Sequence, residues 1–378
     1  MSKILLLSLI LFTVSSFSGT ISHLDFLKQA GLNGSIRIDK SYRVPSGNFH
    51  TTGEFDTAEG LIVCWDIEQE DLQMEMVKFI AEDTLVYVCF KETVEIEKKL
   101  KASGVNMKNI KLIPQSFLIW VRDFGPFWIV NEDGRRDKVV LLNYYGEDVK
   151  KLAGYFQATE HSCPMEEAGG NMMFDGRGTA FCSIHMQQET AGQSEEKIRE
   201  IYRDYFGAEQ VIFLKPLRKE GTGHVDLYCK LLDSNTLLLG EYRNKSDGVE
   251  GNKELLDENF QTLKKIKDLA GKPYRVERIV MPKYKEIPQV TGSVITNSYL
   301  NSLIINKKVL VPVYGLETDQ EALETYRKLM PGYTVKGFDC RKIIELYGAV
   351  HCITMGVYSS QKAILKALNE MSVPAGLN

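Results

Sequence analysis

Residues 60–65 read Gly-Leu-Ile-Val-Cys-Trp, a short apolar run with the length and branched side chains of a buried strand. Apolar residues within Glu70–Ala81 then recur at helical spacing. A strand-like run at residues 84–90, a helical pattern at 94–101 and a third strand-like run at 110–113 follow. Strand, helix, strand, helix and strand in this order predict an α/β fold.

Five small polar turns recur along the chain, and they hold Asp123, Gly170, His224, Asn301 and Cys352. About 47, 54, 77 and 51 residues separate them, and four of the turns precede a hairpin-like pair of strands. Such spacing predicts repeated supersecondary units. Five units that close around an axis would bring the turns together at its mouth, within reach of one ligand.

Length and composition fit one large globular unit. The chain has 378 residues, of which 44% are hydrophobic and 25% are charged. The net charge of −4 leaves no basic stripe that could neutralise phosphates, which argues against a nucleic-acid partner. A mildly acidic protein suits a small cationic substrate.

The N-terminus predicts export. A single lysine in residues 1–3 precedes an almost continuously apolar run at 4–12, and small residues follow around Val14–Gly19. This order predicts a cleaved secretory signal peptide and a secreted or periplasmic protein, and a buried N-terminal helix is the alternative. The run is too short for a transmembrane helix, and no later run is long enough to span a bilayer. The expected parts are a signal peptide, an N-terminal leader and a single domain that carries the chemistry, at residues 1–19, 20–57 and 58–378.

The chain contains seven cysteines, and an odd number leaves at least one free thiol in an exported protein. Four of them lie in apolar, strand-like runs, where buried reduced thiols are expected: Cys64, Cys89, Cys182 and Cys229. Cys-x-x-Cys motifs and histidine-rich clusters do not occur in the sequence. We therefore expect no structural metal site and no cofactor.

Residues 348–355 read Gly-Ala-Val-His-Cys-Ile-Thr-Met, and they place Cys352 in a small-residue turn before β-forming residues. This arrangement is typical of a loop that presents a nucleophile. A buried structural thiol is the alternative, because cysteine is among the most often buried residues. A catalytic role for Cys352 therefore requires other residues that act as a base and that bind a substrate.

His224 and Asp226 are two positions apart, so on a strand their side chains would face the same side. A histidine beside a carboxylate is a candidate acid/base pair. The alternative is a half-buried strand histidine that is satisfied by local hydrogen bonds. Gly221 and Gly223 leave room for the close approach of a ligand.

Asp123 lies among large aromatic residues in the segment Trp-Val-Arg-Asp-Phe-Gly-Pro at residues 120–126. A buried carboxylate is costly unless a cation meets it, and a structural ion pair with Arg122 is one solution. In an extended chain, however, the two side chains would point to opposite faces. Asp123 would then need another cation, such as one carried by a substrate.

Two carboxylates, a histidine and a cysteine together favour chemistry on a guanidinium group. This group is planar and always charged, and its forked donors match paired carboxylates. Its central carbon is a poor electrophile, which a thiolate attacks effectively. The bound cation would lower the pKa of the thiol, and the histidine would protonate departing ammonia and later deprotonate the attacking water.

At these residues the chain resembles the bacterial, Porphyromonas-type peptidylarginine deiminase and agmatine deiminase family. The resemblance implies a five-bladed, pseudo-symmetric α/β propeller of repeated strand–helix units around a central channel that holds the site, in agreement with the repeated units above. Together the matching segments run in the family's order through nearly the whole mature chain: Trp120–Pro126, Gly169–Gly178, Gly221–Asp226, Ser298–Asn301 and His351–Thr354.

The resemblance also implies a role for each matching residue. Cys352 would be the nucleophile, His224 the general acid/base, and Asp123 and Asp226 would hold the guanidinium group. The remaining implied positions would contact the substrate, which is a small-molecule or peptide guanidine: Asn301, Trp120, Gly170 and Asn171.

Two positions depart from the patterns of the family's substrate classes. Agmatine deiminases usually carry Glu directly before the Gly-Gly-Asn, whereas this chain has Ala168 there and Glu167 one position earlier. Secreted peptidylarginine members tend to carry an arginine-rich segment after the hairpin near residue 130, whereas residues 143–148 contain no arginine.

We therefore expect a secreted guanidine deiminase that releases ammonia and leaves a ureido product. The export signal favours peptidyl-arginine as substrate, and agmatine, which would give N-carbamoylputrescine, is the alternative. A non-catalytic arginine-binding module and an amidinotransferase remain rivals. A thiol protease that uses Cys352 and His224 is a further rival, although it gives Asp123 and Asp226 no role.

Overall fold

The computed structural model describes residues 42–131, 138–141, 147–165, 167–184, 193–286 and 294–358. Two features of the sequence analysis lie outside the described residues: the signal peptide at 1–19 and the first part, 143–146, of the segment at 143–148. In the part of the chain that is described, no helix has both the length and the apolar character that a membrane crossing requires.

The first strands and helices form one four-stranded sheet, with the strand order β19-β2-β3-β4. Strand β2 pairs in parallel with β3, and β3 pairs in parallel with β4, as expected when helices connect the strands. Strand β19 joins the last described residues to this first sheet by antiparallel pairing with β2. The elements are β2 Gly60–Cys64, α3 Glu70–Ile80, β3 Leu85–Cys89, α4 Thr93–Ala102, β4 Ile110–Ile113 and β19 Met355–Val357.

Four further sheets repeat one pattern, in which a hairpin of two antiparallel strands leads through a helix to a third, parallel strand. The units are β5 Phe127–Asn131, β6 Lys138–Leu141, α6 Glu147–Tyr155 and β7 Thr159–Ser162; β8 Met173–Phe174, β9 Thr179–Ser183, α8 Glu195–Phe206 and β10 Gln210–Leu214; β11 Cys229–Asp233, β12 Thr236–Glu241, α9 Asn252–Leu263 and β13 Arg275–Val280; and β16 Leu303–Ile305, β17 Lys308–Val313, α10 Asp319–Leu329 and β18 Thr334–Asp339.

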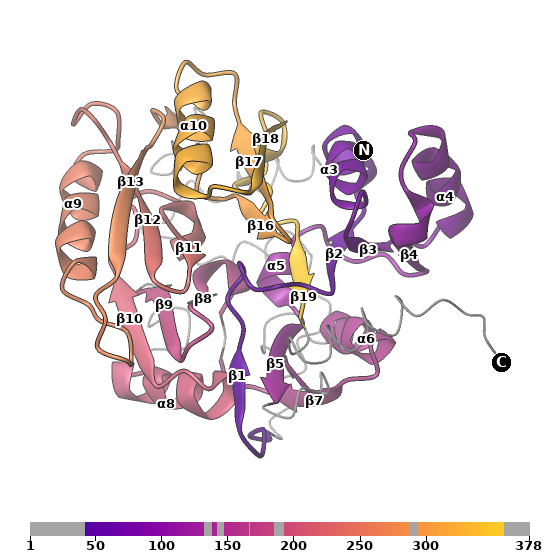
Figure 1. The fold of residues 1–378 in the computed structure, drawn as a ribbon, viewed down its shortest axis with the longest axis horizontal. Helices are drawn as coiled ribbons and strands as arrows, with labels where there is room; N and C mark the ends of the chain where they lie inside the picture. The colour runs from indigo at the N-terminus through magenta and orange to yellow at the C-terminus, as the bar shows by residue number, and fades with distance from the viewer. Residues whose placement is uncertain are drawn as a thin grey trace, which may run out of the picture.

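Figure 1 shows these sheets arranged around the middle of the molecule, with helices such as α8, α9 and α10 on the outside. Two short strands, β14 Lys285–Glu286 and β15 Val294–Ile295, form a separate pair. The α/β fold and its repeated units are therefore as the sequence predicts. Closure into a five-bladed propeller stays a prediction.

Local sequence explains where the helices begin and end. Helix α8 begins after Ser194, whose hydroxyl oxygen accepts a 3.3 Å hydrogen bond from the Lys197 amide. It ends at Gly207, which adopts the left-handed conformation with φ 66°. Residues Ile343–Leu346 form only a 3₁₀ turn, which ends at Tyr347 with φ 67°. Such a turn is too short for the repeating bonds of an α-helix.

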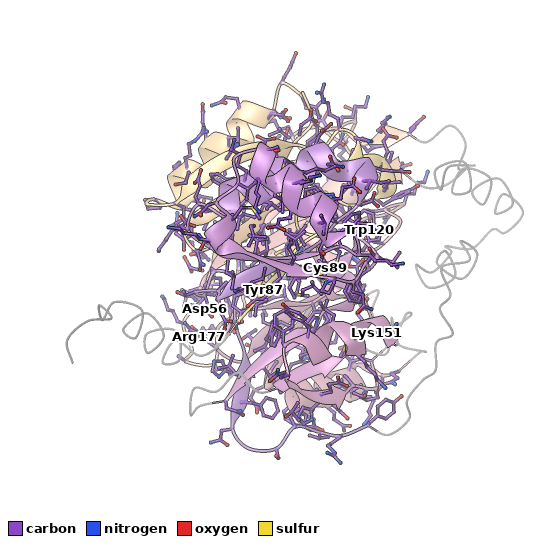
Figure 2. The ribbon with its side chains drawn as sticks, turned by 90° about the vertical axis from the view of Figure 1, so that its right-hand side faces the viewer. Asp56, Tyr87, Cys89, Trp120, Lys151 and Arg177 are labelled. Atoms are coloured by element: carbon purple, nitrogen blue, oxygen red, sulfur yellow. The ribbon has the colours of Figure 1, made fainter. Side chains whose placement is uncertain are left out.

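Part of the predicted leader belongs to the fold. Strand β1, Phe49–Thr51, pairs antiparallel with β5. The carboxylate of Asp56 accepts a 2.9 Å hydrogen bond from the Gly53 amide and lies 3.6 Å from the guanidinium of Arg177. Asp56 and Arg177 lie side by side in Figure 2. These contacts hold residues 49–57 against the sheets.

Asn306 connects two sheets that are far apart in sequence. It lies in the turn between β16 and β17 with φ 42°. Its amide oxygen accepts from the Ala58 N–H at 2.9 Å, and its Nδ2 donates to the Ala58 carbonyl at 2.9 Å and to the Thr84 hydroxyl at 3.2 Å. One side chain therefore ties this hairpin to the residues just before strands β2 and β3.

Replacing Asn306 should weaken the whole fold. Asn306→Gly keeps the left-handed turn but loses these hydrogen bonds and leaves buried backbone groups of Ala58 unpaired, so we expect a loss of about 2–3 kcal/mol in the free energy of unfolding. Urea unfolding measures this loss. Lys307→Gly, at the next left-handed position, is the matched control and should change stability by less than about 1 kcal/mol. Equal effects of the two variants would contradict the proposed link.

Candidate active site

Two aspartates and one histidine surround Gly170, which lies in the 3₁₀ turn Gly169–Asn171 (η3). A Cβ atom at Gly170 would lie 2.5 Å from Nδ1 of His224 and 3.2 Å from one carboxylate oxygen each of Asp123 and Asp226. Nδ1 of His224 is 4.0 Å from Oδ1 of Asp123. Each of these three side chains is at most 5% exposed. The missing side chain at residue 170 is therefore what allows them to meet.

The thiol of Cys352 lies in the same cluster, in the turn that precedes β19. Its Sγ is 3.8 Å from Oδ2 of Asp226 and accepts a 3.2 Å hydrogen bond from Nδ2 of Asn301. The amide oxygen of Asn301 accepts from the Ala349 N–H at 3.1 Å, which fixes its orientation. All seven cysteines are buried free thiols, and Cys352 alone has a measurable exposure, of 6%.

The backbone around these residues differs from the prediction in two places. Residues Val121–Phe124 form a single helical turn (α5), near the middle of Figure 1, rather than an extended chain. Arg122 pairs with Glu54 at 3.2 Å, so the structural ion pair that was considered for Asp123 and Arg122 is not formed. Asp123 instead has the imidazole of His224 as its ion-pair contact, at 4.0 Å, and its Oδ1 accepts no hydrogen bond from the described residues, which agrees with the hypothesis of a substrate cation.

His224 and Asp226 do not lie on a strand. Val225–Leu227 is a 3₁₀ turn (η4), and β11 begins only at Cys229. In the segment before this turn, the buried carboxylate of Glu220 accepts from the amides of Thr222 and Gly223, at 3.0 and 2.6 Å, and in the turn itself the Val225 amide donates to Oδ1 of Asn171 at 3.2 Å. The side chains of His224 and Asp226 still reach Gly170, but through a turn rather than through the alternation of a strand.

Two of the predicted substrate contacts pack against the site. The amide oxygen of Asn171 accepts from the N–H groups of Ser183 and Val225, at 2.8 and 3.2 Å, and thereby joins the turns that carry Gly170 and Asp226. A Cβ atom on Gly348 would lie 2.4 Å from the indole of Trp120 and 3.1 Å from Cβ of Cys352. Direct contact of Asn171 or Trp120 with a substrate stays a prediction.

The pKa values of the two aspartates are shifted in opposite directions. Burial raises the pKa of Asp123 well above its usual value, and the charge of Asp226 raises it further. Burial would also raise the pKa of Asp226, but the hydrogen bond and charge of His351, with the charges of His224 and Lys230, outweigh burial and lower it.

Burial also raises the pKa of the Cys352 thiol well above its usual value, and the negative charges of Asp226 and Asp123 add to this effect. The thiol is therefore protonated in the free site. A bound cation would reverse the electrostatic part of this shift, because it would neutralise the carboxylates beside the sulfur.

One oxygen of each aspartate is left for a ligand. Oδ1 of Asp123 and Oδ1 of Asp226 are buried and have no hydrogen-bond partner among the described residues. Buried carboxylate oxygens in proteins are almost always paired. A planar cation with forked N–H donors would satisfy both oxygens and lie beside the thiol. No group of three or more metal-binding side chains occurs in the described residues.

Three residues that act through the site could not be predicted from the sequence. Glu54 falls within the predicted leader and contacts Arg122 and His351, and no motif marks it. His351 precedes Cys352 directly, but the adjacency alone does not show that its ring contacts Asp226. Glu220, which accepts hydrogen bonds from amides in the segment before His224, carries no sequence signal beyond its nearness to the two glycines.

Gly170→Ala should stop the chemistry while leaving the fold intact. The added Cβ would overlap Nδ1 of His224, so the ring must move, and we expect a fall in kcat of roughly 10²–10⁴, the usual contribution of a general acid/base. Steady-state kinetics and thermal unfolding measure the two effects. Gly154→Ala, on the exposed face of α6 where a Cβ meets nothing within 4 Å, is the control and should keep full activity. Full activity of Gly170→Ala would contradict the placement of His224.

Asp226→Asn should make the Cys352 thiol easier to ionise. The charge of Asp226 raises the pKa of the thiol, so its removal lowers that pKa, and alkylation by iodoacetamide should begin at lower pH. Mass spectrometry of the modified peptide across a pH series measures the midpoint. The exposed Glu196→Gln serves as control and should leave it unchanged. A midpoint that stays in place or rises in Asp226→Asn would refute the electrostatic account.

The sequence is similar to a known protein family over most of its length. The family model for Porphyromonas-type peptidyl-arginine deiminase matches residues 63–357. A Legionella pneumophila protein with the provisional name agmatine deiminase is 26% identical over 262 residues, which are 65% of this chain and 74% of that protein.

Solved structures agree on the fold. A Porphyromonas gingivalis structure, provisionally named arginine deiminase, aligns with a TM-score of 0.71 at 22% identity, over 82% of this chain and 98% of that chain. The agmatine deiminase of Enterococcus faecalis aligns with a TM-score of 0.71 at 20% identity, over 84% and 100%. At these identities the two structures support the α/β fold alone. The family match covers most of the chain, so this protein belongs to the Porphyromonas-type peptidyl-arginine deiminase family and is a hydrolase of amidine C–N bonds.

Proposed function

We propose that this protein deiminates agmatine to N-carbamoylputrescine and ammonia through a covalent intermediate on Cys352. The observation that carries deimination is a pair of buried carboxyl groups, Asp123 and Asp226, that each keep one unpartnered oxygen and that cluster with a thiol and an imidazole. Agmatine is favoured over the peptidyl-arginine of the sequence-based expectation because relatives of similar length carry the name agmatine deiminase.

Binding uses the two free carboxylate oxygens. The guanidinium group donates N–H bonds to Oδ1 of Asp123 and to Oδ1 of Asp226, and its plane faces the sulfur of Cys352. Its positive charge offsets the carboxylates, so Asp123 loses its proton and the pKa of the thiol falls. The nucleophile is therefore generated only when substrate is bound.

The reaction then proceeds in two halves. The thiolate attacks the guanidinium carbon, and the C–N bond to one terminal nitrogen breaks as His224 donates a proton to the departing ammonia. The product of this half is a thiouronium on Cys352. His224 next removes a proton from water, and the resulting hydroxide adds to the carbon. The C–S bond then breaks as the added hydroxyl group passes its proton to the departing sulfur, which leaves the ureido product and the Cys352 thiol.

Asn301 and the buried surroundings assist this sequence. Nδ2 of Asn301 donates to the sulfur at 3.2 Å, and this bond stabilises the thiolate more than the thiol. Because Asp123, Asp226 and His224 are almost entirely buried, the charges interact in a medium of low polarity, where they are stronger than in water.

Peptidyl-arginine is the second candidate, and one contact favours it. Both oxygens of Glu167 are already used: one accepts from the Ala168 amide at 2.8 Å and the other from Nδ2 of Asn171 at 3.1 Å. Glu167 is therefore part of the scaffold rather than a free anchor for the ammonium group of agmatine. The name of the matching family model points to the same substrate class.

Export and closure complete the proposal. The apolar N-terminal run at residues 4–12 supports a cleaved signal peptide, and the N-terminal sequence of the mature protein tests it. The pairing of β19 with β2 supports closure of the repeated sheets into a five-bladed propeller around the site.

Substrate preference is tested with agmatine, a peptide that contains arginine, and free arginine, each supplied separately. We expect ammonia and a ureido product with the highest kcat/KM for agmatine, and no turnover by Cys352→Ala. Higher kcat/KM for the peptide would replace agmatine by the second candidate. Absence of ammonia with all three substrates would contradict the catalytic proposal and leave a binding module.

A further inference from the structure

The ring of His351 lies between two carboxylates, those of Asp226 and Glu54. Nδ1 is 2.7 Å from Oδ2 of Asp226, and Nε2 is 2.6 Å from Oε2 of Glu54. An ionised carboxylate only accepts hydrogen bonds, so both ring nitrogens must carry a proton. His351 is therefore an imidazolium, and its side chain is only 7% exposed.

Glu54 is held ionised and in place by three elements. Its Oε1 accepts from the Ile304 amide at 2.8 Å and lies 2.5 Å from Nζ of Lys230, and its Oε2 accepts from Arg122 at 3.2 Å. Burial would raise the pKa of Glu54, but the charges of Lys230, His351 and Arg122 outweigh burial and hold it well below the usual value. The side chain cannot turn away without breaking contacts to α5, β11 and β16.

Both ring nitrogens of His351 thus contact carboxylates. His351 and His224 therefore have different roles. His351 has no ring nitrogen left to take a proton from Cys352, although the two residues are adjacent. His224, 4.0 Å from Asp123 at its Nδ1, is the histidine available for proton transfer. The unpartnered Oδ1 of Asp226 and the bonded Oδ2 divide the carboxylate into a free end and a fixed end.

Two buried carboxyl groups beside each other would ordinarily share one proton, because like charges in a low dielectric cannot both persist. Asp123 and Asp226 meet this condition at Gly170, and Asp123 responds as expected. The groups that face Asp226 are His351, His224, Asp123 and the Cys352 thiol, with Lys230 behind them. Of these, His351 is the one that makes a direct charged hydrogen bond to it.

We propose that His351, fixed as an imidazolium by Glu54, is a positioning residue that keeps Asp226 ionised and turns its free oxygen toward the guanidinium. The proposal rests on the deiminase function proposed above and deepens it. It assigns to Glu54 and His351 a function in substrate affinity that depends on pH. Arg122 and Lys230 support that function by holding Glu54.

The sign of the pH effect follows from the charges. In the unmodified protein the pKa of Asp226 lies below its usual value, so the carboxylate is present throughout the neutral range. His351→Gln removes the cation and can donate to only one of the two carboxylates. The pKa of Asp226 then rises, the carboxylate is lost as pH falls, and substrate affinity falls with it.

The test measures kcat/KM for agmatine, or for the arginine peptide if that is the better substrate, between pH 5 and 9. In His351→Gln the acidic limb of the profile should move to higher pH, with a loss of at least about tenfold at pH 6 that recovers as pH rises. Glu54→Gln should shift the limb in the same direction by less. The exposed Glu196→Gln should not shift it. A pH-independent loss, or a limb that moves to lower pH, would overturn the proposal.

A binding measurement separates this proposal from the function on which it rests. In a Cys352→Ala background, the Kd for agmatine is measured by calorimetry at pH 6 and pH 8.5, with and without His351→Gln. We expect the second substitution to weaken binding mainly at pH 6. Equal weakening at both values would overturn the positioning role even if the protein turns over substrate. If His351→Gln does not fold, the pH profile of kcat/KM for Glu54→Gln is the deciding measurement. An unchanged profile in that variant would refute the positioning role of Glu54 and His351.

Discussion

The structure depends on two carboxyl groups that are buried side by side and that each keep one oxygen without a hydrogen bond from the described residues. Asp123 and Asp226 each lie 3.2 Å from the position of a Cβ on Gly170. Burying such groups opposes folding, since desolvation of a polar group costs roughly 1–3 kcal/mol even when it stays neutral. The fold tolerates this cost because packing over several sheets holds the two side chains in place.

Each group in the site comes from a different unit of the repeated architecture. Asp123 precedes β5, Gly170 precedes β8, His224 and Asp226 precede β11, Asn301 precedes β16, and Cys352 precedes β19. No local segment could bring them together, and the pairing of β19 with β2 joins the last unit to the first. Bonds such as those from Asn171 to Val225 and from Asn301 to Ala349 then fix the turns against each other. Catalytic geometry and fold stability thus draw on the same contacts.

Much of the fold could be predicted because its signals are local. The apolar runs at Gly60–Cys64 and Leu85–Cys89, and the serine and glycine that bound α8, determine their elements without help from distant residues. The convergence of the five polar turns also followed from their spacing. The conformations of the turns could not be predicted in this way, since Val225–Leu227 is a 3₁₀ turn whose first amide donates to Asn171, 54 residues away in the chain.

The chemistry of the site was likewise visible in part. The thiol, the histidine and the two aspartates stood out because their residue types are unusual in apolar surroundings. Glu54 did not, because its importance comes from Arg122, Lys230 and His351, which are 68, 176 and 297 residues away in the chain and reach it only in the fold. The partner of Arg122 could not be predicted for the same reason: it is Glu54, which is distant in the sequence, and not the adjacent Asp123.

The central claim is that the two unpartnered oxygens receive a guanidinium group over the thiol. A crystal structure of the Cys352→Ala variant with agmatine bound tests it most directly. The account predicts guanidinium nitrogens within hydrogen-bond distance of Oδ1 of Asp123 and of Oδ1 of Asp226, with the central carbon facing residue 352. A guanidinium group bound elsewhere, with those two oxygens still unpartnered, would contradict it.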